Sequence, residues 1–108
     1  MSECLIKNES LEVVISSVGA EMQRVTSNNG TEFLWSGDEK FWNKKAPVLF
    51  PICGGLKDGK FTYKGEEYFL GKHGFARTSE FILEDSGEDF CVYLLKSSEE
   101  TRKSYPFD

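Results

Sequence analysis

Residues that favour turns interrupt this sequence at short intervals, which leaves room for strands but not for a long helix. Chain reversals are expected at Val18-Gly19-Ala20, at Asn28-Asn29-Gly30 and at Lys64-Gly65, because these residues tolerate turn conformations. The loop Asp85-Ser86-Gly87-Glu88-Asp89 is polar enough to lie in water. Short segments between frequent turns predict an all-β fold, a sandwich or barrel with at most short helical turns.

The segments between the turns are rich in alternating, β-branched and aromatic residues, as strands are. The expected strands are residues 11–15, 21–25, 31–35, 61–63, 66–70, 80–84 and 90–96. Residues 90–95 are apolar on both faces, which predicts a strand buried between two layers. One helical turn is expected at residues 38–42, capped by Ser36 or Asp38. A helix start is expected at residues 98–101, and Pro106 keeps that helix short.

The segment from Ala46 to Gly55 carries two prolines, Pro47 and Pro51, within an apolar run. Proline removes a backbone donor and fixes φ, so this spacing forbids a helix and disfavours a central strand. We therefore expect an extended apolar connection that another part of the structure must cover.

Thirteen Lys and Arg residues against eighteen Asp and Glu residues give a net charge of −5. A surface of this sign repels nucleic-acid phosphates and anionic lipids, and no apolar run approaches the roughly 18 residues of a membrane span. We expect one domain, residues 1–108, with neither nucleic acid nor membrane as a partner. The first nine residues do not resemble a signal peptide. Three widely spaced cysteines, Cys4, Cys53 and Cys91, are expected to be buried, reduced thiols of a cytoplasmic protein.

His73 is the only histidine, and it stands beside Gly74 and four residues before Arg77. This pair is suited to donate hydrogen bonds to a hydroxylated or anionic ligand. The residues alone favour the alternative of a purely structural histidine and an arginine paired with Glu80 or another carboxylate.

The aromatic residues Trp35, Phe41, Trp42 and Phe50 predict either a platform for stacking on a sugar or simply core. The glycine-rich residues 54–60 lack the GxxxxGK[ST] pattern of a phosphate loop. One histidine and scattered cysteines give neither a catalytic triad nor a zinc site, so we expect no metal.

A series of weak motifs occurs in one order along nearly the whole chain. They are Ser17-Val18-Gly19-Ala20-Glu21-Met22 within residues 11–22, Glu32-Phe33-Leu34-Trp35-Ser36-Gly37-Asp38, Ala46-Pro47-Val48-Leu49-Phe50-Pro51-Ile52, Leu56-Lys57-Asp58-Gly59-Lys60, His73-Gly74-Phe75-Ala76-Arg77 and Tyr105-Pro106-Phe107. The ordered set resembles the aldose 1-epimerase (galactose mutarotase-like) family, especially its LacX-like branch. The resemblance implies a partial β-sandwich, the N-terminal part of a β-supersandwich of antiparallel strands whose open face binds a hexose.

Members of that family act in carbohydrate metabolism and interconvert the anomers of aldoses or, in some cases, of sugar phosphates. A base takes the proton of the anomeric hydroxyl and an acid protonates the ring oxygen, so that the ring opens and recloses. The resemblance implies no cofactor. It matches His73 to the family's first active-site histidine, a sugar contact, and Arg77 to an arginine that contacts a hydroxyl or a phosphate.

The sequence also departs from the family. Gly55 stands where the family usually carries a substrate-binding arginine, and no second histidine is present. The family's general acid, a histidine, and its general base, a C-terminal glutamate, would lie beyond Asp108. We therefore expect a truncated domain with open sheet edges that is catalytically inactive alone. Two alternatives remain, a carbohydrate-binding module that forms a homo-oligomer through its open sheet and an epimerase completed by another chain.

Overall fold

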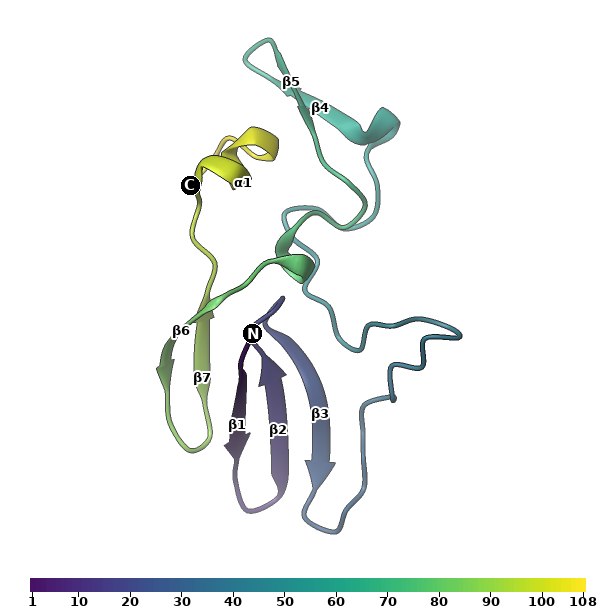
Figure 1. Cartoon of the computed structure of the whole chain (residues 1–108), viewed down its shortest axis with the longest axis vertical. Helices are drawn as coiled ribbons and strands as arrows, with labels where there is room; N and C mark the ends of the chain where they lie inside the picture. Colours follow the sequence, from purple (N-terminus) through teal and green to yellow (C-terminus); the bar gives the residue numbers. More distant parts are fainter.

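The computed structural model describes residues 1–108 as small antiparallel sheets joined by irregular segments (Figure 1). The elements, in chain order, are β1 (Glu3–Lys7), β2 (Leu11–Ser16), β3 (Glu21–Ser27), η1 (Lys57–Gly59), β4 (Lys60–Tyr63), β5 (Glu66–Phe69), η2 (Ala76–Thr78), β6 (Ile82–Ser86), β7 (Cys91–Leu94) and α1 (Glu99–Ser104). Strands β1, β2 and β3 form one sheet, and β4–β5 and β6–β7 form two separate hairpins. The expected all-β class with short helical turns is confirmed.

The N-terminal sheet contains two of the predicted strands and one that the sequence did not indicate. β2 is central and β3 follows it at the expected place, whereas β1 was missed. The predicted strand at residues 31–35 is wrong. After the turn at Gly30 the chain pairs with β3 through a single bridge, Thr26 to Glu32, and then leaves the sheet.

The connection from the sheet to the first hairpin is anchored by a buried carboxylate. Asp38 first caps a single turn, because its Oδ1 accepts a hydrogen bond from the Lys40 backbone N–H. Oε2 of Glu21, a buried β3 residue, then accepts the backbone N–H groups of Lys45 at 2.7 Å and Ala46 at 3.0 Å. Residues 46–55 run extended beyond this anchor without forming a regular strand, as the two prolines predict.

The hairpins and the C-terminal helix follow the local sequence signals. Lys64 and Gly65 both adopt positive φ in the turn between β4 and β5, as predicted. β6 and β7 lie within or close to the predicted segments. The Ser98 side chain accepts the Thr101 backbone N–H, and the Thr101 hydroxyl accepts the Ser98 N–H, which caps α1.

Little of the molecule is buried. Only seven of 108 residues are buried, and Ile15, Leu70 and Ala76 are the hydrophobic side chains among them. The expectation that β7 is covered on both faces is wrong, because β7 pairs with β6 alone and Val92 is 44% exposed. The three thiols are unpaired, but Cys4 and Cys91 are half-buried and Cys53 is exposed, which corrects the expected burial.

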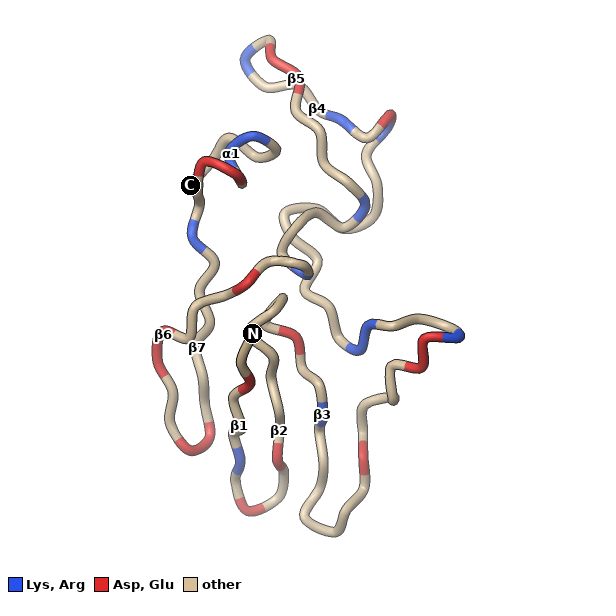
Figure 2. Tube along the Cα trace, in the orientation of Figure 1, with Lys and Arg blue, Asp and Glu red and all other residues tan.

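Charged residues are distributed along the whole trace, and Figure 2 shows no segment where Lys and Arg gather. No helix has the length and apolar character needed to cross a lipid bilayer.

Candidate functional site

Two segments distant in sequence meet at the carbonyl of Phe50. Its oxygen accepts the backbone N–H groups of Phe75 at 3.0 Å and Ala76 at 3.1 Å, and Phe50 bridges to Gly74. Gly74 has φ of 72°, and a Cβ at this position would lie 2.3 Å from the Phe50 oxygen. Only glycine permits this approach, which brings residues 72–77 against the extended connection.

His73 is fixed in this loop by two hydrogen bonds with one glycine. Its backbone N–H donates to the Gly54 carbonyl at 2.8 Å, and its Nδ1 accepts the Gly54 N–H, also at 2.8 Å. An accepting Nδ1 carries no proton, so the neutral ring holds its proton on Nε2. Nε2 is therefore the ring atom free to donate a hydrogen bond to a ligand.

Arg77 lies in η2 at the other end of the same loop. Its Nη2 donates to the Lys72 carbonyl at 3.3 Å, which ties the guanidinium to the residue before His73. Its Nε is buried and has no hydrogen-bond partner. A buried donor without a partner is costly, and because this N–H is inaccessible, a ligand could meet Arg77 only through the terminal nitrogens of its guanidinium. The expected alternative, pairing of Arg77 with Glu80, does not form, because Glu80 binds Ser17 and the N-terminus instead.

The backbone of Arg77 is held against the N-terminal sheet. Gly19 has φ of 72°, and a Cβ there would lie 2.7 Å from the Arg77 carbonyl oxygen. The loop that carries both predicted site residues is thus fixed on two sides, by Phe50 and by the turn after β2.

Gly55, which follows the glycine bonded to His73, is exposed and has open space around it. A Cβ built there meets no heavy atom within 4 Å. The position that the family resemblance assigns to an arginine is therefore next to His73 and sterically free.

The aromatic residues considered as a platform are only partly brought together. Trp35 and Trp42 stack with ring centroids 6.2 Å apart, and the Trp35 Nε1–H donates to the Lys44 carbonyl. Phe41 is 81% exposed on its own, and Phe50 instead packs edge-on against Tyr105. No single platform of four rings exists.

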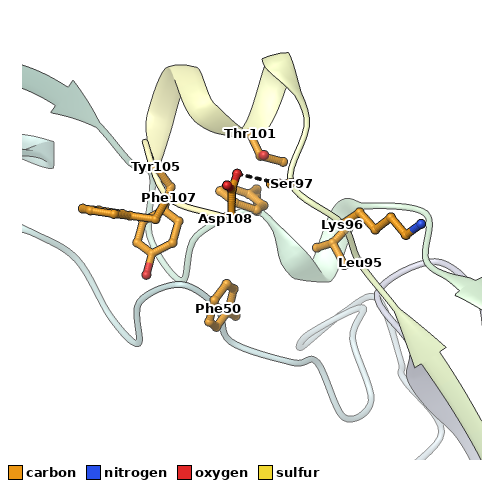
Figure 3. Close-up of a pocket in the computed structure, with 9 residues that line it drawn as sticks. Phe50, Leu95, Lys96, Ser97, Thr101, Tyr105, Phe107 and Asp108 are labelled. Atoms are coloured by element: carbon orange, nitrogen blue, oxygen red, sulfur yellow. Dashed lines mark hydrogen bonds between the residues drawn. The ribbon is translucent and has the colours of Figure 1, made fainter.

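A cavity of about 180 Å³ lies beside the loop and contains neither His73 nor Arg77 (Figure 3). Its walls come from the C-terminal segment and from the two segments that meet at the Phe50 carbonyl, a contact that we call the Phe50 crossing. The lining residues are Phe50, Phe75, Leu95, Lys96, Ser97, Thr101, Tyr105, Phe107 and Asp108. Apart from the aromatic Tyr105-Pro106-Phe107 motif, nothing in the sequence indicated this cavity.

The pKa shifts lie away from His73. The hydroxyl of Thr26 donates to the Glu32 carboxylate and, with the guanidinium of Arg24, lowers its pKa. The Arg102 guanidinium, with the Ser97 hydroxyl, lowers the pKa of Asp108. Burial raises the pKa of the Cys91 thiol, and the nearby Cys4 adds to this. The structure places no three His, Cys, Asp or Glu side chains where they could hold a metal ion.

Comparisons with known proteins match one family along nearly the whole chain. A family model described as aldose 1-epimerase matches residues 2–108. The plasmid and chromosomal LacX proteins of Lactococcus lactis subsp. lactis are 36% and 35% identical over 105 residues. Each alignment covers 93% of this chain and 35% of the relative, so the chain spans about a third of the length of these relatives.

Solved structures of related proteins share the fold of this chain. A galactose mutarotase related enzyme from Lactobacillus acidophilus is 48% identical with a TM-score of 0.95, and a galactose mutarotase-like protein from Lactobacillus casei is 31% identical with a TM-score of 0.93. Both matches cover 98% of this chain and 36% of the solved chain. The Slr1438 protein of Synechocystis, at 23% identity and a TM-score of 0.86, shares the fold. The expected partial β-sandwich is confirmed.

Proposed function

Because this chain belongs to the aldose 1-epimerase family, we propose that it forms one wall of a sugar-binding site in carbohydrate metabolism. In this proposal His73 and Arg77 contact the hydroxyls of a hexose or the phosphate of a hexose phosphate. The supporting observation is the bond from the Gly54 N–H to His73 Nδ1, because it leaves Nε2–H as the ring's one donor for a ligand.

Arg77 supports the same proposal through the guanidinium donors that its single bond to Lys72 leaves unused. A guanidinium donates in a planar fork, which suits adjacent hydroxyls or phosphate oxygens. Its Nη2 is bonded to the Lys72 carbonyl, so the side chain is oriented before any ligand arrives. An oriented donor loses less entropy on binding than a free one.

We further propose that the chain alone does not accelerate anomer exchange. The reaction needs one group to remove the anomeric proton and another to protonate the ring oxygen. His73 is the only histidine, and its Nδ1 is occupied by the Gly54 amide. One Nε2–H can polarise a sugar oxygen, but it cannot act as acid and base on opposite sides of the ring.

A second candidate is a carbohydrate-binding module that forms a homo-oligomer without turnover. Its supporting observation is the set of large hydrophobic side chains that are exposed to solvent. A second copy of the chain would cover part of this surface. Both candidates are placed in the cytoplasm, where three unpaired thiols stay reduced. Neither requires a cofactor.

The test is a titration with glucose, galactose and glucose 6-phosphate, followed by NMR of the His73 and Gly54 amides. We expect both amides to shift with a hexose or its phosphate. The variant His73→Asn is expected to abolish binding, because asparagine tolerates positive φ and offers Oδ1 to the Gly54 amide but lacks Nε2. Binding that survives in His73→Asn, or an absence of any sugar-dependent shift, would overturn the sugar site.

Polarimetry of freshly dissolved α-glucose and α-galactose tests the proposal that the chain alone does not accelerate anomer exchange. We expect the pure chain to leave the spontaneous rate of mutarotation unchanged. A rate that rises in proportion to the chain's concentration, and that falls in His73→Asn, would show that the chain is active alone.

A further inference from the structure

Two of the three cysteines lie where the N-terminal sheet meets the β6–β7 hairpin. In Figure 1, β7 runs beside β1, which is an edge strand of that sheet. Cys4 belongs to β1 and Cys91 begins β7, and both side chains are half-buried. The third thiol, Cys53, is exposed and belongs to the extended connection. Cys4 and Cys91 thus come from distant parts of the sequence and from facing elements.

Two hydrogen bonds fix how β1 and β7 lie against each other. At one end, the Lys7 N–H donates to the Glu88 carbonyl at 2.7 Å, beside the turn of the hairpin. At the other end, the Tyr93 hydroxyl donates to the carbonyl of Ile15, which pairs with Cys4. The two strands therefore run in opposite directions, and Cys4 lies at the level where β7 reaches the sheet.

The alternation of side chains along each strand turns both thiols toward this contact. Cys91 and Tyr93 are two residues apart in β7, so they share the face that Tyr93 directs at the N-terminal sheet. Cys4 lies between two exposed residues, and it shares a face with its register partner, the buried Ile15. The fold thus directs both sulfur atoms to the space between sheet and hairpin.

The titration of these groups agrees with one compact cluster. Burial raises the pKa of the Cys91 thiol, and the nearby Cys4 adds to this. Burial also raises the pKa of Tyr93, and both thiols add to this effect. Because charges influence one another strongly only at short range in water, the two thiols lie close to each other and to the phenol.

We propose that Cys4 and Cys91 are a redox pair, which a low-molecular-weight disulfide such as oxidised glutathione converts into an intramolecular disulfide. The bond ties the β6–β7 hairpin to the N-terminal sheet, and reduced glutathione reverses it. A hairpin of two strands is marginally stable by itself, so the link restrains an element that gains much from it.

The step is a thiol–disulfide exchange. One thiolate of the pair attacks a sulfur of oxidised glutathione, so a protein–glutathione bond forms, the S–S bond of the reagent breaks, and one glutathione leaves and takes a proton. The second cysteine loses its proton and attacks the protein sulfur of this mixed disulfide, which releases the other glutathione. The two cysteines have then lost two electrons and two protons, and the two glutathione molecules have gained them.

The test equilibrates the purified full chain with mixtures of oxidised and reduced glutathione, blocks the remaining thiols and maps disulfides by peptide mass spectrometry. We expect a peptide that links Cys4 to Cys91 to accumulate in the monomer as the oxidised fraction rises, and to disappear when reduced glutathione is restored. Cys53 should carry glutathione at most. Mixed disulfides alone, or a bond that involves Cys53 or a second copy of the chain, would decide against the pair.

Single serine variants are the matched controls. Cys53→Ser should form the bond as the unchanged chain does, whereas Cys4→Ser and Cys91→Ser should form no intramolecular disulfide. An intramolecular disulfide in either of the last two would show that the pairing is wrong.

Amide hydrogen exchange of the unchanged chain tests what the bond does. On oxidation, exchange in β6–β7 should slow at least about tenfold, because the link suppresses local opening of the hairpin. The β4–β5 hairpin contains neither cysteine and should exchange as before. No slowing in β6–β7, or equal slowing in both hairpins, would contradict the proposed restraint.

Discussion

The Gly54 main-chain amide takes up one of the two ring nitrogens of His73, which leaves Nε2 for the proposed ligand. The sequence predicts the residue as a sugar contact, since it is the only histidine and belongs to a matched motif, and this stays a prediction. Its bond to Gly54 was not predictable, because that bond depends on how the Phe50 crossing brings distant segments together. Arg77 is likewise predicted by position, whereas its unpaired Nε became visible only with the packing around it.

Gly74→Ala is expected to destabilise the site loop by at least about 2 kcal/mol, from positive φ and from the clash with the Phe50 carbonyl. Gly55→Ala is the control, because its Cβ has open space and no positive φ is involved. It should be neutral or stabilise by about 0.4–1 kcal/mol. Urea unfolding measures both, and equal midpoints for the two variants would contradict the role assigned to the Phe50 crossing.

Gly55→Arg tests the departure from the family pattern. The position is exposed and next to the residue that bonds His73, and a Cβ placed there meets no other heavy atom. We expect tighter binding of hexose phosphate, by about tenfold for one added charge-assisted hydrogen bond. Gly55→Gln, of similar length but neutral, should gain less; a gain as large with glutamine would exclude the charge as the cause.

At the scale of elements, local signals predicted hairpins better than isolated strands. Lys64-Gly65 has the turn residues that a two-residue hairpin requires, and β4–β5 forms there. β1 was missed because its sequence lacks a clear flanking turn and depends on pairing with β2. Residues 31–35 have strand propensity, but their pairing with β3 ends after the Phe33 N–H donates to the Val25 carbonyl.

The bridge between Thr26 and Glu32 is expected to depend on pH. The Thr26 hydroxyl is the main cause of the lowered pKa of Glu32, so the bonded state favours the carboxylate. Its contribution is therefore present above the ordinary pKa of a glutamate and is lost as pH falls through the lowered value. NMR titration of the Glu32 side chain should show this, and Thr26→Val should move its pKa upward. An unchanged pKa in Thr26→Val would remove the hydroxyl as the cause.

At the scale of the molecule, stability is expected to be uneven. β2 is paired on both sides within a three-stranded sheet, whereas each hairpin strand is paired on one side only. Amide hydrogen exchange should therefore be slowest in β2 and fastest in β4–β5 and β6–β7. Uniform protection across all seven strands would show that the elements unfold as one unit.

The open edge of β6–β7 also bears on how this protein behaves when it is abundant. An uncovered strand attracts any extended chain, including those emerging from ribosomes or partly unfolded neighbours. Cells that make the chain in quantity would therefore need molecular chaperones to keep it out of insoluble deposits.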